Sequence, residues 1–155
     1  MASDGEALTG LWFEGQKYFA AGVVDKNDEK QLPIFDLTAK WLRIYFSGQE
    51  PDFLPVLKPE GTKFRRLVWD ILLAIPYGKT LTYGEIAKDV AARMGIPRMS
   101  AQAVGGAVGH NPISLIIPCH RVVGADGSLT GYAGGIDKKR KLLMIESKAY
   151  GIVHE

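Results

Sequence analysis

The sequence contains a single cysteine, Cys119, in 155 residues. An intramolecular disulfide is therefore excluded, and so is a zinc site built from several thiolates. The three histidines, His110, His120 and His154, are too few and too widely spaced to indicate a metal cage. The sequence thus predicts no bound metal, and its one free thiol fits a reducing compartment, the cytoplasm.

Long apolar runs are also missing. No stretch approaches the ~18 residues that a membrane-spanning helix needs, and the first residues carry Asp4 and Glu6 rather than the basic start of a secretory signal. Hydrophobic residues make up 46% of the chain and charged residues 23%, which is close to the average for folded domains. We therefore expect a folded protein that makes no use of a membrane.

Charge is divided unevenly along the chain. Residues 1–60 hold 6 basic and 10 acidic side chains, whereas residues 61–155 hold 13 basic and 7 acidic ones. A basic half indicates a polyanionic partner, although solvated surface charge explains it equally well.

Spaced prolines in residues 50–61 (EPDFLPVLKPEG) predict a linker between an N-terminal domain (1–60) and a C-terminal domain (61–155). A surface loop within one domain is the alternative.

The N-terminal region predicts a small α/β unit. Residues 7–13 (ALTGLWF) are expected to form a strand, and residues 22–24 a weaker one. Asp36 is a candidate N-cap of a helix that Gly48 ends. The apolar positions of that helix are Leu37, Trp41, Leu42, Ile44 and Tyr45. Nothing in this region carries obvious chemistry, so its aromatic residues are expected to build a core.

The C-terminal region predicts three helices in succession. Apolar residues at positions 64, 67, 68, 71, 72 and 75 share one helical face, and residues 76–78 (PYG) end that helix. Residues 82–85 (TYGE) fit a capping box at the start of a second helix. Its buried face would hold Ile86, Ala87, Val90 and Met94. After a turn at residues 95–97, Ser100 is a candidate cap for a helix over residues 101–108, which Asn111 and Pro112 end.

Two short helices across a tight turn suggest a helix-turn-helix. The second helix is rich in small residues, as residues 101–109 (AQAVGGAVG) make clear. Glycine weakens a helix by about 1 kcal/mol relative to alanine, so this composition needs another reason. Small side chains let the backbone approach a nucleic-acid groove, or they allow close packing against another helix. The residues alone leave both explanations open.

The strongest chemical signal surrounds the cysteine. Residues 115–117 (LII) predict a short buried strand, which leads directly into Pro118, Cys119, His120 and Arg121. A histidine can take the proton of a thiol, nearby positive charge favours the thiolate, and a carboxylate can orient the histidine. These residues indicate a reactive cysteine. The alternative is an inert core thiol, because a lone cysteine is usually a small buried hydrophobe.

Residues 117–123 (IPCHRVV) resemble the active-site motif of the O6-alkylguanine-DNA alkyltransferases, also called methylated-DNA–protein-cysteine methyltransferases. The resemblance extends to Tyr83, to residues 103–107 (AVGGA), to Asn111 with Pro112, and to residues 131–135 (GYAGG). It runs continuously from about residue 61 to residue 146 and more weakly through residues 8–13. Four residues alone would be a weak signal, but the ordered set is specific.

For the fold, the resemblance implies a ribonuclease H-like α/β lobe at the N-terminus. It also implies a mainly α, winged-helix-like C-terminal lobe that contains the helix-turn-helix. Family members usually have a strand before the region of residues 7–13, and little chain precedes it here, so we expect that first strand to be missing. An exposed sheet edge would follow. Some relatives hold zinc in this lobe, but with no second cysteine none is expected here.

For the activity, the resemblance implies direct-reversal repair of double-stranded DNA that carries O6-alkylguanine. A monomer would bind the minor groove and flip the damaged nucleotide out of the stack. Cys119 would take the methyl or other alkyl group from guanine O6 in a direct displacement. The thioether is stable, so the protein would be a self-inactivating methyltransferase that acts once and needs no cofactor. The resemblance also allows transfer from thymine O4.

The resemblance also assigns roles to residues. His120 would act as the base through a water molecule, with Glu146 orienting it and Asn111 bracing the arrangement. Tyr83 would supply a proton or hydrogen bond to the leaving guanine. The other assigned residues are those of the base pocket, Val122, Tyr132, Ala133 and Val108, and those of the DNA face, Thr82, Gln102, Ala103 and Gly105.

Several of these residues also have a purely structural interpretation. Tyr83 could cover a helix start, Asn111 before a proline is a common turn unit, and Glu146 could be a surface charge on a terminal helix. The basic run at residues 138–141 (KKRK) could contact phosphates or be a solvated helix face. Gln102 stands where family members commonly carry an arginine that fills the gap left by the flipped base, so we expect weaker support for flipping.

Three other functions fit parts of the sequence. A non-enzymatic binder of alkylated DNA would share the fold but lack the nucleophile. A winged-helix transcription factor would prefer undamaged sequence and would need no buried histidine–glutamate pair. A cysteine hydrolase would turn over and would require an oxyanion hole.

Overall fold

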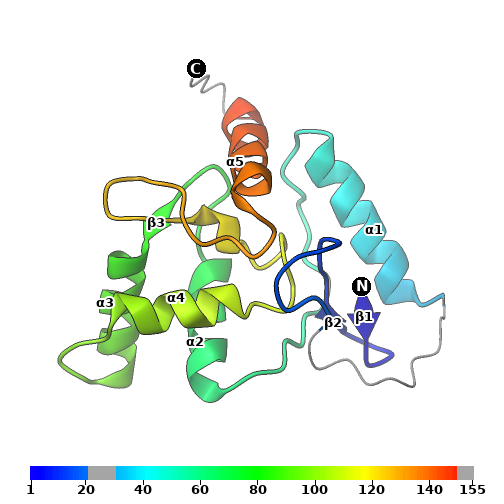
Figure 1. Ribbon diagram of the computed structural model, residues 1–155. Helices are drawn as coiled ribbons and strands as arrows, with labels where there is room; N and C mark the ends of the chain where they lie inside the picture. The colour runs from blue at the N-terminus through cyan, green and yellow to red at the C-terminus, as the bar shows by residue number, and fades with distance from the viewer. Residues whose placement is uncertain (21–30, 150–155) are drawn as a thin grey trace.

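The computed structural model describes residues 1–20 and 31–149. Within these residues the fold is mixed α/β, with five α-helices and two sheets of two short strands each. Helix α1 (Pro33–Phe46) lies with the first sheet on one side of the molecule, and helices α2 (Lys63–Leu73), α3 (Tyr83–Met94) and α4 (Ala101–Gly109) gather on the other (Figure 1). The C-terminal helix α5 (Ile136–Ala149) stands between the two groups.

The first sheet pairs β1 (Ala2–Ser3) with β2 (Leu8–Gly10) in antiparallel orientation. A strand therefore does precede residues 7–13, and the expectation of a missing first strand was wrong. The reversal is local, because Asp4 Oδ1 accepts hydrogen bonds from the backbone of Glu6 and Ala7. The predicted strand at residues 7–13 is shorter than expected, and the one at 22–24 lies outside the described residues.

Helix α1 begins at Pro33, so the prediction of Asp36 as its N-cap was wrong. Proline suits the first helical position because its φ is already helical and it lacks an N–H that would need a partner. Asp36 lies instead in the first turn, where its carboxylate interacts favourably with the helix dipole. Leu37 is exposed, and the buried face consists of Ile34, Thr38, Trp41 and Tyr45.

The predicted helices of the C-terminal region are confirmed as α2, α3 and α4. Thr82 and Glu85 form the capping box of α3, Gly95 ends it in the left-handed conformation (φ 67°), and the Ser100 hydroxyl caps α4. Met94 is exposed rather than buried, and Ala91 takes its place on the inner face of α3. The three helices pack on one another, with α3 and α4 forming the helix-turn-helix.

A second sheet connects this bundle to the cysteine. Strand β3 (Leu81–Thr82) pairs in parallel with β4 (Val122–Val123), which directly follows a 3-10 turn at Cys119–Arg121. The start of α3 is therefore held beside the segment that follows the cysteine. The strand predicted at residues 115–117 is absent: the segment is buried but turns, and Leu115 adopts a left-handed φ of 73°.

One hydrophobic core joins both halves of the chain. It contains Trp41 and Tyr45 of α1, Trp69 of α2, and Ile117 from the turn before the cysteine. An isolated β-bridge between Leu11 and Ile113 also crosses between the halves. In the part of the chain that the structure describes, no helix is long and apolar enough to cross a membrane.

Candidate active site

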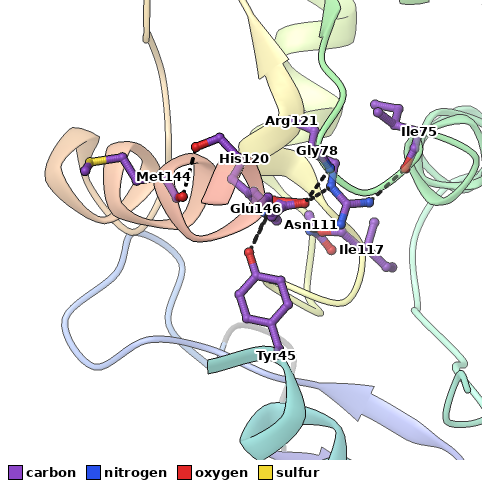
Figure 2. Close-up of polar contacts among 10 residues, drawn as sticks. Tyr45, Ile75, Gly78, Asn111, Ile117, His120, Arg121, Met144 and Glu146 are labelled. Carbon is purple, nitrogen blue, oxygen red and sulfur yellow. Dashed lines mark hydrogen bonds and ion pairs between the residues drawn. The ribbon is translucent and has the colours of Figure 1, made fainter. Parts of the chain in front are cut away.

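A buried carboxylate organises the site. Glu146 projects from α5 and is 1% exposed. Its Oε2 accepts hydrogen bonds from His120 Nε2 (2.5 Å) and from the Tyr45 hydroxyl (3.2 Å). Its Oε1 accepts hydrogen bonds from Arg121 Nε (2.6 Å) and from the Gly78 amide (3.4 Å). Figure 2 shows the carboxylate surrounded by these donors. Burial alone would raise the pKa of Glu146, but the hydrogen bond from His120 and the charge and hydrogen bond of Arg121 outweigh it and hold the pKa below its usual value. The group is therefore an anion at neutral pH.

The carboxylate also determines the state of His120. An ionised carboxylate can only accept, so Nε2 must carry the hydrogen that His120 shares with Glu146. Nδ1 is then the basic nitrogen, and it is buried without a hydrogen-bond partner among the described residues. Burial lowers the pKa of His120 despite the opposing influence of Glu146. A neutral imidazole with a free lone pair is the form that a general base requires.

Arg121 and Tyr45 belong to this cluster, and sequence reasoning did not assign a role to either. Arg121 is buried and also donates from Nη1 to the Ile75 carbonyl (2.8 Å). A signal existed for Arg121, because it directly follows the cysteine and histidine. No local signal marked Tyr45, whose hydroxyl reaches Glu146 from a helix far away in sequence.

Cys119 lies in the 3-10 turn, with only 5% of its surface exposed. Burial raises the pKa of its thiol, although a hydrogen bond from Asn111 and the charge of Lys139 act in the opposite direction. The expectation that positive neighbours would favour the thiolate is thus outweighed by desolvation. The resting form is the neutral thiol, so this cysteine needs a base to become a nucleophile.

Asn111 braces the segment that leads to the cysteine. Its Nδ2 donates to the Ile117 carbonyl (2.8 Å), and its Oδ1 accepts from the Ile113 amide (2.9 Å). The side chain thus satisfies buried backbone groups that a strand would have paired with a neighbour, which is why residues 115–117 can turn. These partners are backbone groups, and the bracing of His120 and Glu146 assigned to Asn111 stays a prediction.

Lys139 is the residue for which the structure changes the interpretation most. The basic run at residues 138–141 was undecided between phosphate contact and a solvated face, yet Lys139 is fully buried. Its Nζ donates to the carbonyls of Val122 (2.5 Å) and Thr130 (2.9 Å). Burial lowers its pKa. Lys139 therefore ties the strand after the cysteine to the loop before Tyr132, while its neighbours in the run are exposed.

Tyr83, the first residue of α3, faces the same loop. Its hydroxyl donates to the Thr130 carbonyl (3.1 Å), and burial raises its pKa. Gly131 and Gly105 lie beside it: a Cβ added at Gly131 would be 3.4 Å from the hydroxyl and one at Gly105 would be 3.8 Å from the ring, both ordinary van der Waals contacts. Gly131 also has a φ of 67°, a left-handed conformation that favours glycine.

A small cavity adjoins this arrangement. It measures about 270 Å³, and its lining residues include Tyr132 and Ala133, which were assigned to the base pocket, and Gly105, which was assigned to the DNA face. Val108 and Val122 are buried in the core instead and are not among the lining residues. A larger groove of about 990 Å³ runs along α2 and residues 57–59, but none of the predicted site residues lines it.

The residues predicted to contact DNA differ in their exposure and in their contacts. Gln102 and Ala103 are exposed on α4, where a large partner can reach them, and Gly105 is partly buried near Tyr83. The Thr82 hydroxyl already accepts a hydrogen bond from the Glu85 amide as the helix cap.

Among the described residues, no group of three or more metal-ligating side chains comes together. His110 stacks on Tyr18 instead, and His154 lies outside the described residues.

Comparison with known proteins gives a consistent result. Residues 63–148 match the family model described as the DNA-binding domain of 6-O-methylguanine DNA methyltransferase. The chain is 45% identical over 149 residues to a methylated-DNA–protein-cysteine methyltransferase of Haemophilus influenzae, an alignment that covers 96% of this chain and 79% of that protein. A protein of the same name from Methanosarcina acetivorans is 51% identical over 112 residues, which is 72% of this chain and 69% of the relative.

Solved structures agree. A crystal structure of Mycobacterium tuberculosis OGT in complex with DNA superposes with a TM-score of 0.81 at 42% identity. The match covers 96% of this chain and 85% of that one.

Proposed function

Because the chain belongs to the methylated-DNA–protein-cysteine methyltransferase family, we propose that it repairs double-stranded DNA by moving an alkyl group from guanine O6 to Cys119. The observation that carries the assignment to these residues is a buried neutral thiol followed directly in the chain by a histidine whose Nε2 is held by Glu146 and whose Nδ1 is free to accept. A core cysteine without function would not need that arrangement beside it.

The reaction is a direct displacement at a saturated carbon. Nδ1 of His120 takes the thiol proton through a water molecule, and Sγ of Cys119 attacks the alkyl carbon. A C–S bond forms, the C–O bond breaks, and its electron pair passes to the guanine ring system. Tyr83 donates a hydrogen bond or its proton as that negative charge develops. The imidazolium releases the thiol proton to solvent. One proton taken up from solvent, by the guanine anion or by the tyrosinate that protonated it, leaves guanine and Tyr83 neutral.

The same chemistry explains why one molecule acts once. Water does not displace the thiolate from a neutral thioether, so the alkylated cysteine is not regenerated. The displacement needs neither a metal nor a cofactor, because the thiol, the base and the proton donor supply every group that changes. Repair is therefore stoichiometric and irreversible.

DNA would bind through α3 and α4. The helix-turn-helix enters the minor groove, and Gln102, Ala103 and Gly105 approach the strand, with Thr82 at the start of α3. The damaged nucleotide is flipped into the cavity, which costs a few kcal/mol of unstacking that pocket contacts offset. Tyr132 and Ala133 line that cavity, while Val108 and Val122 support it from the core.

The proposal extends to the finer architecture. We assign residues 1–60 to a ribonuclease H-like α/β lobe and residues 61–155 to a winged-helix-like lobe that binds DNA as a monomer. The presence of the helix-turn-helix next to the β3–β4 pair supports the second assignment. A nucleophile that must stay a free thiol fits a reducing compartment, the cytoplasm.

The test is to mix the protein with duplex DNA that carries O6-methylguanine and to measure the mass of the intact protein and of its peptides. One added methyl on Cys119 with an equimolar amount of restored guanine is expected. A hydrolase would turn over, and a binder or regulator would stay unmodified. In Cys119→Ser, transfer should be abolished while binding to the lesion remains. Persistent transfer in that variant would place the nucleophile elsewhere.

A further inference from the structure

A turn from the N-terminal region reaches the cavity that Tyr132 and Ala133 line. The Lys17 amide donates to the Ala133 carbonyl (3.1 Å) in the loop that lines the cavity. Gln16, which is buried, accepts from the Ser114 hydroxyl (3.1 Å) in the segment that leads to the cysteine. The turn is thus fastened both to the loop that lines the cavity and to the segment before the cysteine, and Lys17 and Tyr18 are among the lining residues of the cavity.

At the edge of the cavity, the ring of Tyr18 stacks on His110. The ring centroids are 4.2 Å apart and the planes differ by 24°. His110 is itself fixed, because its Nδ1 donates to the Gly106 carbonyl at the end of α4 (2.7 Å). Both rings line the cavity together with Gly105, Gly106, Gly109 and Gly131. The four glycines contribute no side chain to the cavity wall, whereas the stacked rings of Tyr18 and His110 occupy space there.

The backbone of Tyr18 is strained in a way that supports this placement. Its φ is 60°, a left-handed conformation that costs an L-residue with a large side chain roughly 1–2 kcal/mol. Such a conformation persists only where the surroundings hold it, and strained residues cluster at functional sites. Here the stack on His110 and the hydrogen bond of Lys17 hold it, and the result is a ring fixed at the cavity.

We propose that Tyr18 is a specificity-determining residue whose ring, stacked on His110, limits the size of the O6 substituent that the protein accepts. The cavity volume of about 270 Å³ falls below the roughly 300–1,000 Å³ of pockets for drug-sized ligands. A purine with a methyl group fits, whereas a bulkier substituent must displace the wall. This inference rests on the proposed function, because it assumes that the flipped base enters this cavity.

The test compares transfer from two duplex DNAs, one with O6-methylguanine and one with O6-benzylguanine. Tyr18→Gly is the informative variant, because glycine adopts a positive φ without strain and the turn can keep its course. The ratio of the benzyl to the methyl second-order rate constant should rise by at least about tenfold, a typical effect of added room in an apolar pocket. Tyr18→Phe should keep the wild-type ratio, and Tyr18→Trp should lower it.

Phe19→Ala is the matched control. Phe19 is the next aromatic residue, is exposed, and packs near Trp12 (ring centroids 6.0 Å apart) rather than lining the cavity. The ratio should stay at the wild-type value in this variant. Because the ratio is internal to each protein, partial misfolding lowers both rates and leaves it unchanged.

The outcomes separate this inference from the function on which it rests. If wild-type protein alkylates Cys119 but Tyr18→Gly leaves the ratio unchanged, the size-limiting role is wrong and the repair function stands. If wild-type protein transfers no methyl group to Cys119, the function itself is wrong and this inference falls with it.

Discussion

The cluster around Glu146 and the outer face of α4 are built in opposite ways. In the cluster, His120, Arg121 and Glu146 are buried, and the carboxylate accepts from four donors. On α4, Gln102 and Ala103 are exposed, and the helix itself depends on the Ser100 cap and on the buried residues Val104, Ala107 and Val108. The groups proposed to do chemistry are thus also groups that hold the fold together, whereas the groups proposed to meet DNA are not.

This difference determines what a substitution can reveal. A change in the cluster alters the reaction and the free energy of unfolding together, because a buried charge loses its partner. A change on the face of α4 alters binding alone, because surface substitutions away from caps and cores usually change stability by less than about 0.5 kcal/mol. Measuring both quantities for each variant tests the comparison directly.

Glu146→Gln is expected to have the largest effect. The amide cannot neutralise Arg121 or hold His120 in the tautomer with a free Nδ1, so transfer should slow by the ~100–10,000-fold typical of general-base loss. Breaking a buried ion pair should also lower the free energy of unfolding by about 3–5 kcal/mol. Single-turnover transfer and urea unfolding provide the two measurements. An undiminished transfer rate in folded Glu146→Gln would remove Glu146 from the mechanism.

Lys139→Met is expected to have the next largest effect. Methionine retains the apolar stem but leaves the carbonyls of Val122 and Thr130 without their buried donor. Each unsatisfied group costs about 1–3 kcal/mol, which urea unfolding can measure. Lys138→Met is the control, because Lys138 is exposed in the same run. Equal stability of the two variants would show that the buried contacts of Lys139 contribute nothing.

A smaller loss of stability is expected on acidification. The pKa of His120 lies below its ordinary value of 6.5 because the imidazole is buried, so the unfolded chain binds a proton more readily than the folded one. The stability that results is complete above pH 6.5 and is lost as the pH falls from there toward the folded-state pKa. The lowered pKa of Glu146 has the same sign and adds a loss below about pH 4.5.

Urea unfolding measured from pH 7.5 to pH 4 tests this dependence. In His120→Gln, which has no titrating imidazole at that position, the fall between pH 6.5 and 5 should be shallower than in the wild type. Identical profiles would mean that His120 is not the buried neutral base described here.

The same contrast explains what could be predicted from the sequence. Helices α2, α3 and α4 were predicted closely because their signals are local: the capping box at Thr82 and Glu85, the Ser100 cap and the glycine at position 95 all act within a few residues. The pairing of His120 with Glu146 was predicted from the family resemblance, and in the structure a hydrogen bond joins the two side chains.

What could not be predicted depends on contacts between distant parts of the chain. An apolar run such as residues 115–117 has the same composition in a buried strand and in a buried turn, and the side chain of Asn111 decided for the turn. Lys139 could not be distinguished from its exposed neighbours, because its two carbonyl partners lie in other segments. Asp36 was misread because a proline at the first helical position competes with an acidic cap further along.

Gln102→Arg probes the other side of the comparison and is expected to have the smallest effect on the protein itself. Gln102 is exposed on α4 and lies outside the core, so the free energy of unfolding should change by less than about 0.5 kcal/mol. DNA affinity should increase by roughly 1 kcal/mol, about fivefold, because a guanidinium adds a phosphate-seeking charge and a longer donor for the gap left by a flipped base. Binding of lesion DNA to the Cys119→Ser background at two salt concentrations measures the affinity, and single-turnover transfer by the protein that keeps Cys119 measures the repair rate. If affinity, salt dependence and repair rate all match those of glutamine, then position 102 does not approach the DNA, and the recognition face must be sought elsewhere on α3 or α4.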